Sequence, residues 1–190
     1  MATSNTRPSV SRRTALAGLG TGGLGLALAA GSRGAAAQDT ASEMAKHPIV
    51  GVWMATTRTG PAPSIFSPDG TVTIARPVTQ AGPQGVVFVS SEVGTWEPTS
   101  ARGVHFTSVH LQSDANGTYT GSVTIDGHPT VSEDGQTFVD DSPDSGPTIR
   151  DAAGNVVAAP RGQPPVTGIR MGVGSPGFPA GTPTAGTPTA

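Results

Sequence analysis

The stretch that decides the fold is GVHFTSVHLQSDANGTYTGSVTI, residues 103–125. It contains the pair Asn116-Gly117, which is typical of two-residue hairpin turns because both central positions of a type I′ turn need a positive φ. The flanking runs, 103–113 and 118–125, are rich in Val, Ile, Thr and aromatic residues, as strands are. The second run also alternates between apolar and polar residues, which favours one buried and one wet face. In the first run both faces carry apolar residues, so the alternation does not assign its inner face.

Similar runs occur along the chain, separated by turn pairs about 8–12 residues apart, a spacing typical of barrels and sandwiches. We expect Pro61 and Pro63 to break the chain after the first strand and Pro98 to end a later one. The one helical turn expected lies at 42–47. The sequence therefore predicts an all-β fold, a single antiparallel meander closing as a small barrel, with a two-sheet β-sandwich as the alternative. The expected strands are 49–57, 64–66, 71–75, 86–91, 93–97, 103–113, 118–125, 137–140, 148–150, 156–158 and 166–171.

Composition excludes several classes of protein. The 190 residues include 27 Gly, 18 Pro and no Cys. Helix interiors disfavour Gly and Pro, so a helical bundle is not expected, and a disulfide scaffold or thiol nucleophile is excluded. All 13 acidic residues follow residue 38, whereas four of the 11 basic ones precede it, so the chain without residues 1–37 has a net charge of −6. An acidic domain of this kind is not expected to bind nucleic acid.

The first 37 residues have the layout of an export signal. A basic segment with Arg12 and Arg13 is followed by a weakly apolar, glycine-rich run and then by small residues, Ala35 and Ala37, before a cleavage point. The adjacent arginines resemble the core of a twin-arginine signal, which implies the twin-arginine export machinery as a partner. The alternative, an uncleaved membrane anchor, needs a longer and more apolar run. We therefore expect export across the cytoplasmic membrane, to the cell envelope or the medium, with no integral membrane segment left after cleavage.

Between the two ends lies the folded part. Residues 38–47 are expected to form a short linker with the helical turn, and residues 48–171 the barrel domain. Residues 172–190 are uncharged and end in two copies of Ala-Gly-Thr-Pro-Thr, a composition that predicts a disordered tail. A cell-surface spacer is the functional alternative for this tail.

The first predicted strand carries a family resemblance. Gly51-Val52-Trp53 resembles the Gly-x-Trp signature of lipocalins and other calycins, and 66–71 (FSPDGT) looks like a hairpin of lipocalin-like bacterial domains. Arg170 stands where those barrels have an Arg on the last strand. The resemblance implies a calycin-like barrel closed at one end by Gly51, Trp53 and Arg170, with the guanidinium packed over the indole. The whole chain looks like a group of exported bacterial proteins without an assigned function.

Residues that could carry chemistry do not form a recognisable site. His105 and His110 are five apart on one strand and face opposite sides, so they cannot share a metal; the histidines are expected at the surface or in hairpins. The acids at 140, 141 and 144 lack the spacing of a calcium loop. A Gly-x-Ser-x-Gly elbow and a phosphate loop are absent from the sequence. We therefore expect no catalytic residue, no metal and no cofactor.

Two hypotheses for the function remain. The first is an exported, non-enzymatic barrel that binds a small apolar ligand in a cavity lined by aromatic side chains. The second is a structural or protein-interaction domain of the cell envelope, in which the aromatics fill a packed core. The lining residues expected under the first hypothesis are Trp53, Phe66, Phe88, Trp96 and Phe106.

Overall fold

The computed structural model of the chain describes residues 43–82 and 85–179. The predicted export signal, with Arg12, Arg13, Ala35 and Ala37, lies outside the described residues, as do residues 38–42 of the linker and residues 180–190. A helical turn at 43–46 agrees with the expectation from sequence. Among the described residues, no helix is long and apolar enough to cross a membrane.

The described part of the chain is nearly all β, as predicted. Its 13 strands are antiparallel and belong to one sheet, so the two-sheet sandwich is not the observed architecture. The strands are β1 (Gly51–Thr57), β2 (Gly60–Phe66), β3 (Thr71–Ile74), β4 (Thr79–Gly82), β5 (Gly85–Val89), β6 (Glu92–Pro98), β7 (Val104–Ser113), β8 (Tyr119–Gly127), β9 (Thr130–Val131), β10 (Thr137–Asp140), β11 (Gly146–Asp151), β12 (Val156–Ala158) and β13 (Val166–Arg170).

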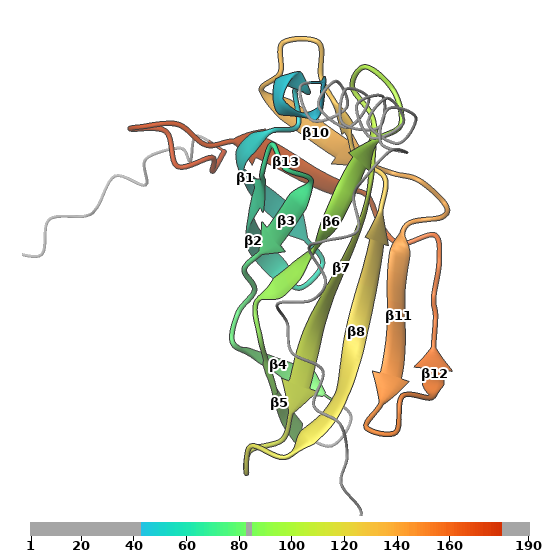
Figure 1. Cartoon of the computed structure of the whole chain (residues 1–190). Coiled ribbons are helices and arrows are strands. Elements are labelled where there is room, and N and C mark those ends of the chain that lie inside the picture. Colours follow the sequence, from blue (N-terminus) through green and yellow to red (C-terminus); the bar gives the residue numbers. More distant parts are fainter. Residues whose placement is uncertain (1–42, 83–84, 180–190) are drawn as a thin grey trace, which may run out of the picture. The chain divides into compact units, whose positions relative to one another are not determined.

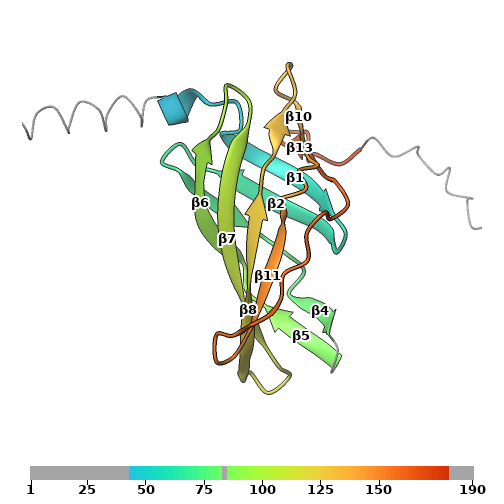
Figure 2. The same cartoon turned by 90° about the vertical axis from the view of Figure 1, so that its right-hand side faces the viewer.

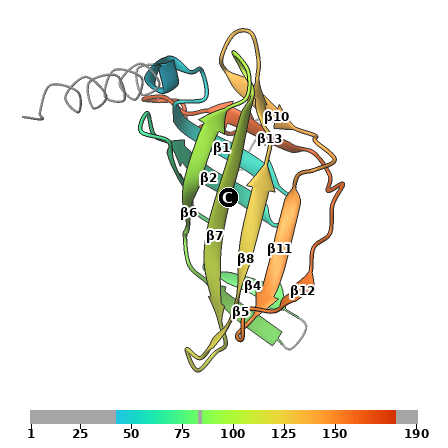
Figure 3. The ribbon, with the colours of Figure 1, turned by 45° about the vertical axis from the view of Figure 1, so that its right-hand side comes forward.

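The sheet curls into a half-barrel (Figure 1). Its strand order is β12-β11-β8-β7-β6-β3-β2-β1-β13-β10-β9, with β4 and β5 attached through β7. At one end an isolated bridge joins Gly103, just before β7, to Thr130 of β9, and so links two distant parts of this order. Figure 3 shows β1 and β2 crossing behind β7 and β8, and Figure 2 shows β4 and β5 extending at the opposite end. We call the end at the Gly103–Thr130 bridge the bridged end.

The pairing predicted within 103–125 is confirmed, but the turn is not the expected two-residue type. Its loop is 115–117, because the Asp114 carbonyl accepts from the Gly117 N–H and the Asp114 N–H donates to the Thr118 carbonyl. β7 and β8 pair from Phe106↔Gly127 to Ser113↔Tyr119, with a bulge at 112–113. The carboxylate of Asp114 accepts hydrogen bonds from the backbone nitrogens of Asn116 and Thr118, at 2.8 and 2.9 Å, which fixes the turn.

The strand at Gly60–Phe66 contradicts the expected break at Pro61 and Pro63. Pro63 pairs with Met54 of β1, and its carbonyl accepts a hydrogen bond from Ala75 on the other side of the strand. In an antiparallel strand the N–H and the carbonyl of one residue point toward the same neighbouring strand, and residues two apart point the same way. The N–H groups that Pro61 and Pro63 lack would therefore point toward β3 and not toward β1. β3 begins to pair with β2 only at Ser64. Proline is tolerated at such a partly unpaired strand edge.

The remaining differences concern short elements. β4 and the two-residue β9 were not expected, because neither has a period-2 apolar pattern and each is defined by its partner strand. At the start of the predicted tail, Gly172 and Ser175 form a bridged turn, and Gly177 packs on Met54 and Met171. The hydrophobic core lies largely toward the bridged end and contains Ile49, Trp53, Ala55, Ala62, Phe66, Val72, Ile74, Trp96, Val104, Val131 and Phe138.

Candidate functional site

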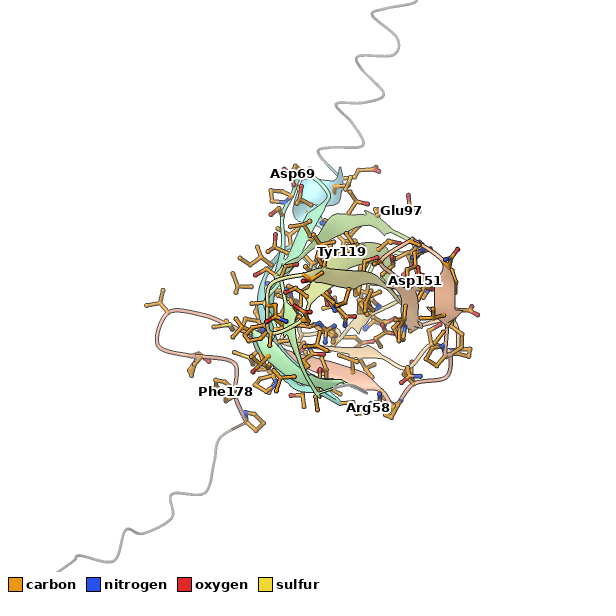
Figure 4. The ribbon with its side chains drawn as sticks, turned by 90° about the horizontal axis from the view of Figure 1, so that it is seen from below. Arg58, Asp69, Glu97, Tyr119, Asp151 and Phe178 are labelled. Carbon is orange, nitrogen blue, oxygen red and sulfur yellow. The ribbon has the colours of Figure 1, made fainter. Side chains whose placement is uncertain are left out.

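The concave side of the sheet encloses a cavity of about 620 Å³. Figure 4 looks into the half-barrel from the end opposite the bridge, where strands surround inward-facing side chains. Strands β1, β2, β7, β8 and β11 each contribute two or three lining residues, and the β4–β5 hairpin, β10 and β12 contribute others. The apolar lining includes Ala55, Ala62, Phe66, Ile74, Val87, Phe106, Val123, Ile125, Phe138, Ile149, Val157 and Val166.

Two of the five predicted lining residues face this cavity. Phe66 and Phe106 do so, and their rings meet edge to face at 5.8 Å. Trp53 and Trp96 lie instead in the packed core, where each indole N–H donates to a backbone carbonyl. Phe88 is 42% exposed, and it is Val87, its neighbour on β5, that reaches the cavity. Core aromatics and lining aromatics could not be told apart from the sequence, because both kinds of side chain point inward.

The predicted closure residues meet at the bridged end. Trp53 and Arg170 are paired across β1 and β13, and the guanidinium carbon lies 4.2 Å from the centre of the indole ring. The guanidinium also donates to the carbonyls of Pro48, Val50 and Gly135, and burial lowers its pKa. Gly51 has a φ of 143°, and a Cβ there would lie 2.5 Å from Nη1 of Arg170. These three residues therefore form a structural plug and do not line the cavity.

A buried polar group of four side chains, here called the Glu92 cluster, lies beside the cavity. Its centre is the carboxylate of Glu92 on β6, which has no exposed surface. Arg76 Nε and His110 Nδ1 both donate to Oε1, the latter at 3.1 Å, and Ser108 Oγ donates to Oε2 at 2.7 Å. Arg76 and His110 also line the cavity, so the cluster supplies polar groups to an otherwise largely apolar wall.

Glu92 is ionised at neutral pH. Burial by itself raises the pKa of this carboxyl group. The hydrogen bond from His110, the positive charge of Arg76 and the hydrogen bonds from Arg76 and Ser108 together outweigh burial and hold the pKa below its ordinary value. An ionised carboxylate only accepts hydrogen bonds, so Nδ1 of His110 must carry a proton.

The two buried histidines differ in one respect. His47 uses both ring nitrogens, since Nδ1 accepts from the Ile49 backbone N–H and Nε2 donates to the Ser100 carbonyl. His110 is 4% exposed, and its Nε2 has no hydrogen-bond partner. His47 therefore contradicts the expectation of surface or hairpin histidines, whereas His110 lies in the β7–β8 hairpin but is buried. His105 and His128 do lie outside the core and stack on each other at 4.5 Å, and His105 is on the face opposite His110, as predicted.

Several other polar residues of the lining are already engaged within the protein. Ser64 Oγ donates to the Ala62 carbonyl, and Ser145 Oγ donates to Asp140. Asp140 also accepts from the backbone N–H of His128. In the described ranges, His and acidic side chains do not gather in groups of three or more that could hold a metal ion.

Sequence reasoning did not find the Glu92 cluster. One signal was present: Glu92, Gly94 and Trp96 share a face of β6, so an acid stands on the same inward face as a buried Trp. The expected strand began at Val93, so Glu92 was not counted as part of it. The inner face of β7 could not be assigned because it carries Ser108 and His110, while the apolar Val109 and Leu111 face outward.

Comparisons with protein-family models, with curated proteins and with solved structures gave no significant match to this chain.

Proposed function

We propose that this domain binds a small, predominantly apolar molecule inside the half-barrel and is not an enzyme. The observation that carries the proposal is the cavity of about 620 Å³, whose lining is largely aliphatic and aromatic. Ligand pockets typically measure about 300–1,000 Å³ and combine an apolar wall with a few polar groups. A small barrel without a ligand role would be expected to fill its interior with side chains.

The arrangement of polar groups supports binding over catalysis. His110 has a carboxylate behind it, as a catalytic base often does, but a base needs a nucleophile or substrate proton within reach. Ser108, the hydroxyl nearest to it in the cluster, donates its proton to Glu92 and is 1% exposed. Ser64 and Ser145 of the lining likewise donate their protons to groups of the protein. A non-enzymatic role is therefore the simpler proposal.

We further propose that the domain acts outside the cytoplasm as a lipocalin-like protein. The twin-arginine pattern at Arg12 and Arg13 supports export. The packing of Arg170 on Trp53 beside Gly51 supports the resemblance to lipocalins. N-terminal sequencing of the exported protein tests the first part, since a start other than near Gln38 contradicts the proposed cleavage.

Binding is tested with N-phenyl-1-naphthylamine, a neutral dye whose fluorescence rises in apolar surroundings. We expect saturable binding to the wild-type chain. Val123→Phe places a larger side chain in the cavity and is expected to abolish most of the binding. Val109→Phe is the matched control, because Val109 is on the neighbouring strand and 37% exposed on the outer face. Absence of saturable binding, or an equal loss in both variants, would contradict the proposal.

One observation favours the alternative, an interaction domain of the cell envelope. A row of exposed apolar residues crosses the outer face of β1, β2, β6 and β7, in register through Thr73 of β3. Nothing in the structure shows what covers it. Replacing two members by Ser is expected to leave dye binding intact. If this alternative holds, the same variant should also lose the retention of the protein in an envelope fraction. The members are Val52, Ile65, Val93 and Val109.

A further inference from the structure

The unpartnered ring nitrogen of His110 points to the chemistry of the ligand. We propose that the ligand is neutral and amphipathic, with an apolar body in the cavity and a hydroxyl group, or an equivalent hydrogen-bond donor, that donates to Nε2 of His110. This inference rests on the proposed function, since it assumes that the cavity binds a small molecule.

The state of His110 follows from its partners. Nδ1 carries a proton because it faces the carboxylate of Glu92. The negative charge of that carboxylate is already balanced by the guanidinium of Arg76, which contacts the same oxygen. A second positive charge on the imidazole would have no counterion in this buried place. The ring is therefore neutral, and its Nε2 presents a lone pair.

This lone pair lacks a partner in a place where one is expected. Nε2 has almost no solvent-exposed surface and accepts no hydrogen bond from the protein, while His110 forms part of the cavity wall. Buried polar groups are almost always hydrogen-bonded, because leaving one unpaired is unfavourable. Glu92 holds the ring through Nδ1, so the position of Nε2 is set before a ligand binds. A donor from the cavity reaches this nitrogen once a neighbouring lining side chain moves aside, because Nε2 itself has almost no accessible surface.

Charge decides between kinds of polar head. A carboxylate head would bring a second buried anion close to Glu92, and the cation of the cluster, Arg76, is already paired. A purely apolar molecule would leave Nε2 unpartnered. A hydroxyl group satisfies the nitrogen without adding charge, so it fits the cluster better than either of the other two.

The test compares three probes of one size class on the full chain: 2-naphthol, which has a hydroxyl donor, 2-methoxynaphthalene, which has none, and 2-naphthoate, an anion. We expect 2-naphthol to bind the wild-type protein more tightly than 2-naphthoate. The ratio of its affinity to that of 2-methoxynaphthalene should fall by about three- to tenfold in the variant His110→Asn, the effect of one hydrogen bond. Because the ratio is compared between two proteins, differences in the hydrophobicity of the probes cancel.

His110→Asn is chosen because the Asn amide can still donate to Glu92 while the acceptor at Nε2 is lost. His128→Asn, at a histidine that does not line the cavity, is the control and should leave the ratio unchanged. If the variant does not fold, the ¹⁵N signal of Nε2 in the wild type decides. It should shift on addition of 2-naphthol but not of 2-methoxynaphthalene.

The outcomes separate this inference from the proposed function. If none of the three probes binds and N-phenyl-1-naphthylamine also fails, the proposed function is wrong. If the neutral probes bind but the ratio is the same in wild type and His110→Asn, the cavity binds ligands and the role of His110 is wrong. Tighter binding of 2-naphthoate would also overturn the inference, since it would mean that the site prefers an anion.

Discussion

The carboxylate of Glu92 is the most deeply buried charge among the described residues. It has no exposed surface and is held by Arg76, Ser108 and His110. Removing one partner of a buried ion pair is strongly destabilising, because the other charge is left uncompensated. We expect Glu92→Gln to lower the free energy of unfolding by about 3 kcal/mol, measured by urea denaturation. Glu97→Gln, at an exposed position of the same strand, is the control and should change it little.

The same group makes stability depend on pH. The pKa of Glu92 in the folded protein lies below its ordinary value of 4.5. A carboxyl group with a lowered folded pKa binds protons more readily when unfolded, so its stabilising contribution is present above about pH 4.5 and is lost as the pH falls through the folded value. We expect the loss of stability below pH 4.5 to be smaller in Glu92→Gln than in the wild type, measured as urea midpoints against pH. Equal slopes would contradict this assignment.

Gly51 is subject to both a strained backbone conformation and a close approach of Arg170, whereas Gly60 is subject to backbone strain alone. The φ of 143° at Gly51 is strained for any other residue, and a Cβ would lie 2.5 Å from the Arg170 guanidinium. Gly60 has a φ of 117° with nothing within 4 Å of its Cβ position, so Gly60→Ala measures backbone strain alone. We expect Gly51→Ala to destabilise by about 2 kcal/mol, as strain and overpacking typically do, and by more than Gly60→Ala. Similar losses of thermal stability in the two variants would mean that the Arg170 contact is readily displaced.

Some contacts between single residues could be predicted from the sequence and others could not. Gly51, Trp53 and Arg170 could be placed together because short motifs at the two ends of the domain pointed to them. The contact of Glu92 with His110 could not, because it depends on the register of β6 on β7 and on which face of β7 is inward. A polar inward face on a strand runs against the hydrophobic pattern from which faces are assigned.

The β7–β8 hairpin is the element in which turn chemistry and charge are most clearly connected. Asp114 is partly exposed, but two backbone N–H groups donate to its carboxylate, and these hydrogen bonds hold its pKa below the ordinary value of 3.8. We expect Asp114→Ala to lower the thermal midpoint at pH 7. The difference in thermal midpoint from wild type should shrink as the pH falls below about 3.8. Protonation of the Asp114 carboxylate removes its stabilising contribution to the folded state. Asp144→Ala serves as the control, and a difference that is constant with pH would contradict this role.

Strands flanked by a clear turn sequence were predicted, whereas strands that form only through hydrogen bonds to a neighbouring strand were not. The hairpins at Asn116-Gly117 and Asp69-Gly70 carry both a turn pair and β-branched flanks. β9 consists of Thr130 and Val131 alone, and it is a strand because β10 and the segment before β7 supply its hydrogen bonds. β2 was predicted too short because an isolated proline is read as a breaker, whereas its effect depends on whether the neighbouring edge is paired.

The cavity is a property of the whole curled sheet. It exists because β4, β5, β11 and β12 extend one end of the barrel beyond the core that fills the other end. Local sequence signals carry hairpin pairing, but they do not carry the pairing of β13 with β1, which joins residues more than one hundred positions apart along the chain. The family resemblance pointed to this closure through Trp53 and Arg170, whereas the volume left inside the sheet could not be predicted from the sequence.

This division between a filled and a hollow end should appear in hydrogen exchange. Trp53 and Ala55 of β1 are buried in the core, and β1 is paired on both sides. All three residues of β12 are exposed, and β12 pairs only with β11, as β4 pairs only with β5. Local openings are most frequent where few apolar contacts hold a strand. We expect amides of β1 and β2 to exchange slowest and those of β4 and β12 fastest.

Ligand binding should slow exchange at the hollow end. Val87 and Val157 line the cavity from β5 and β12, so a bound molecule adds apolar contacts to the strands that otherwise open most readily. A ligand that binds only the folded state slows exchange through every opening that releases it, global unfolding included. Saturating N-phenyl-1-naphthylamine is therefore expected to slow exchange in β4, β5, β11 and β12 as well as in β1 and β2. Exchange in β4, β5, β11 and β12 at the same rate with and without the dye would mean that the dye does not bind the interior.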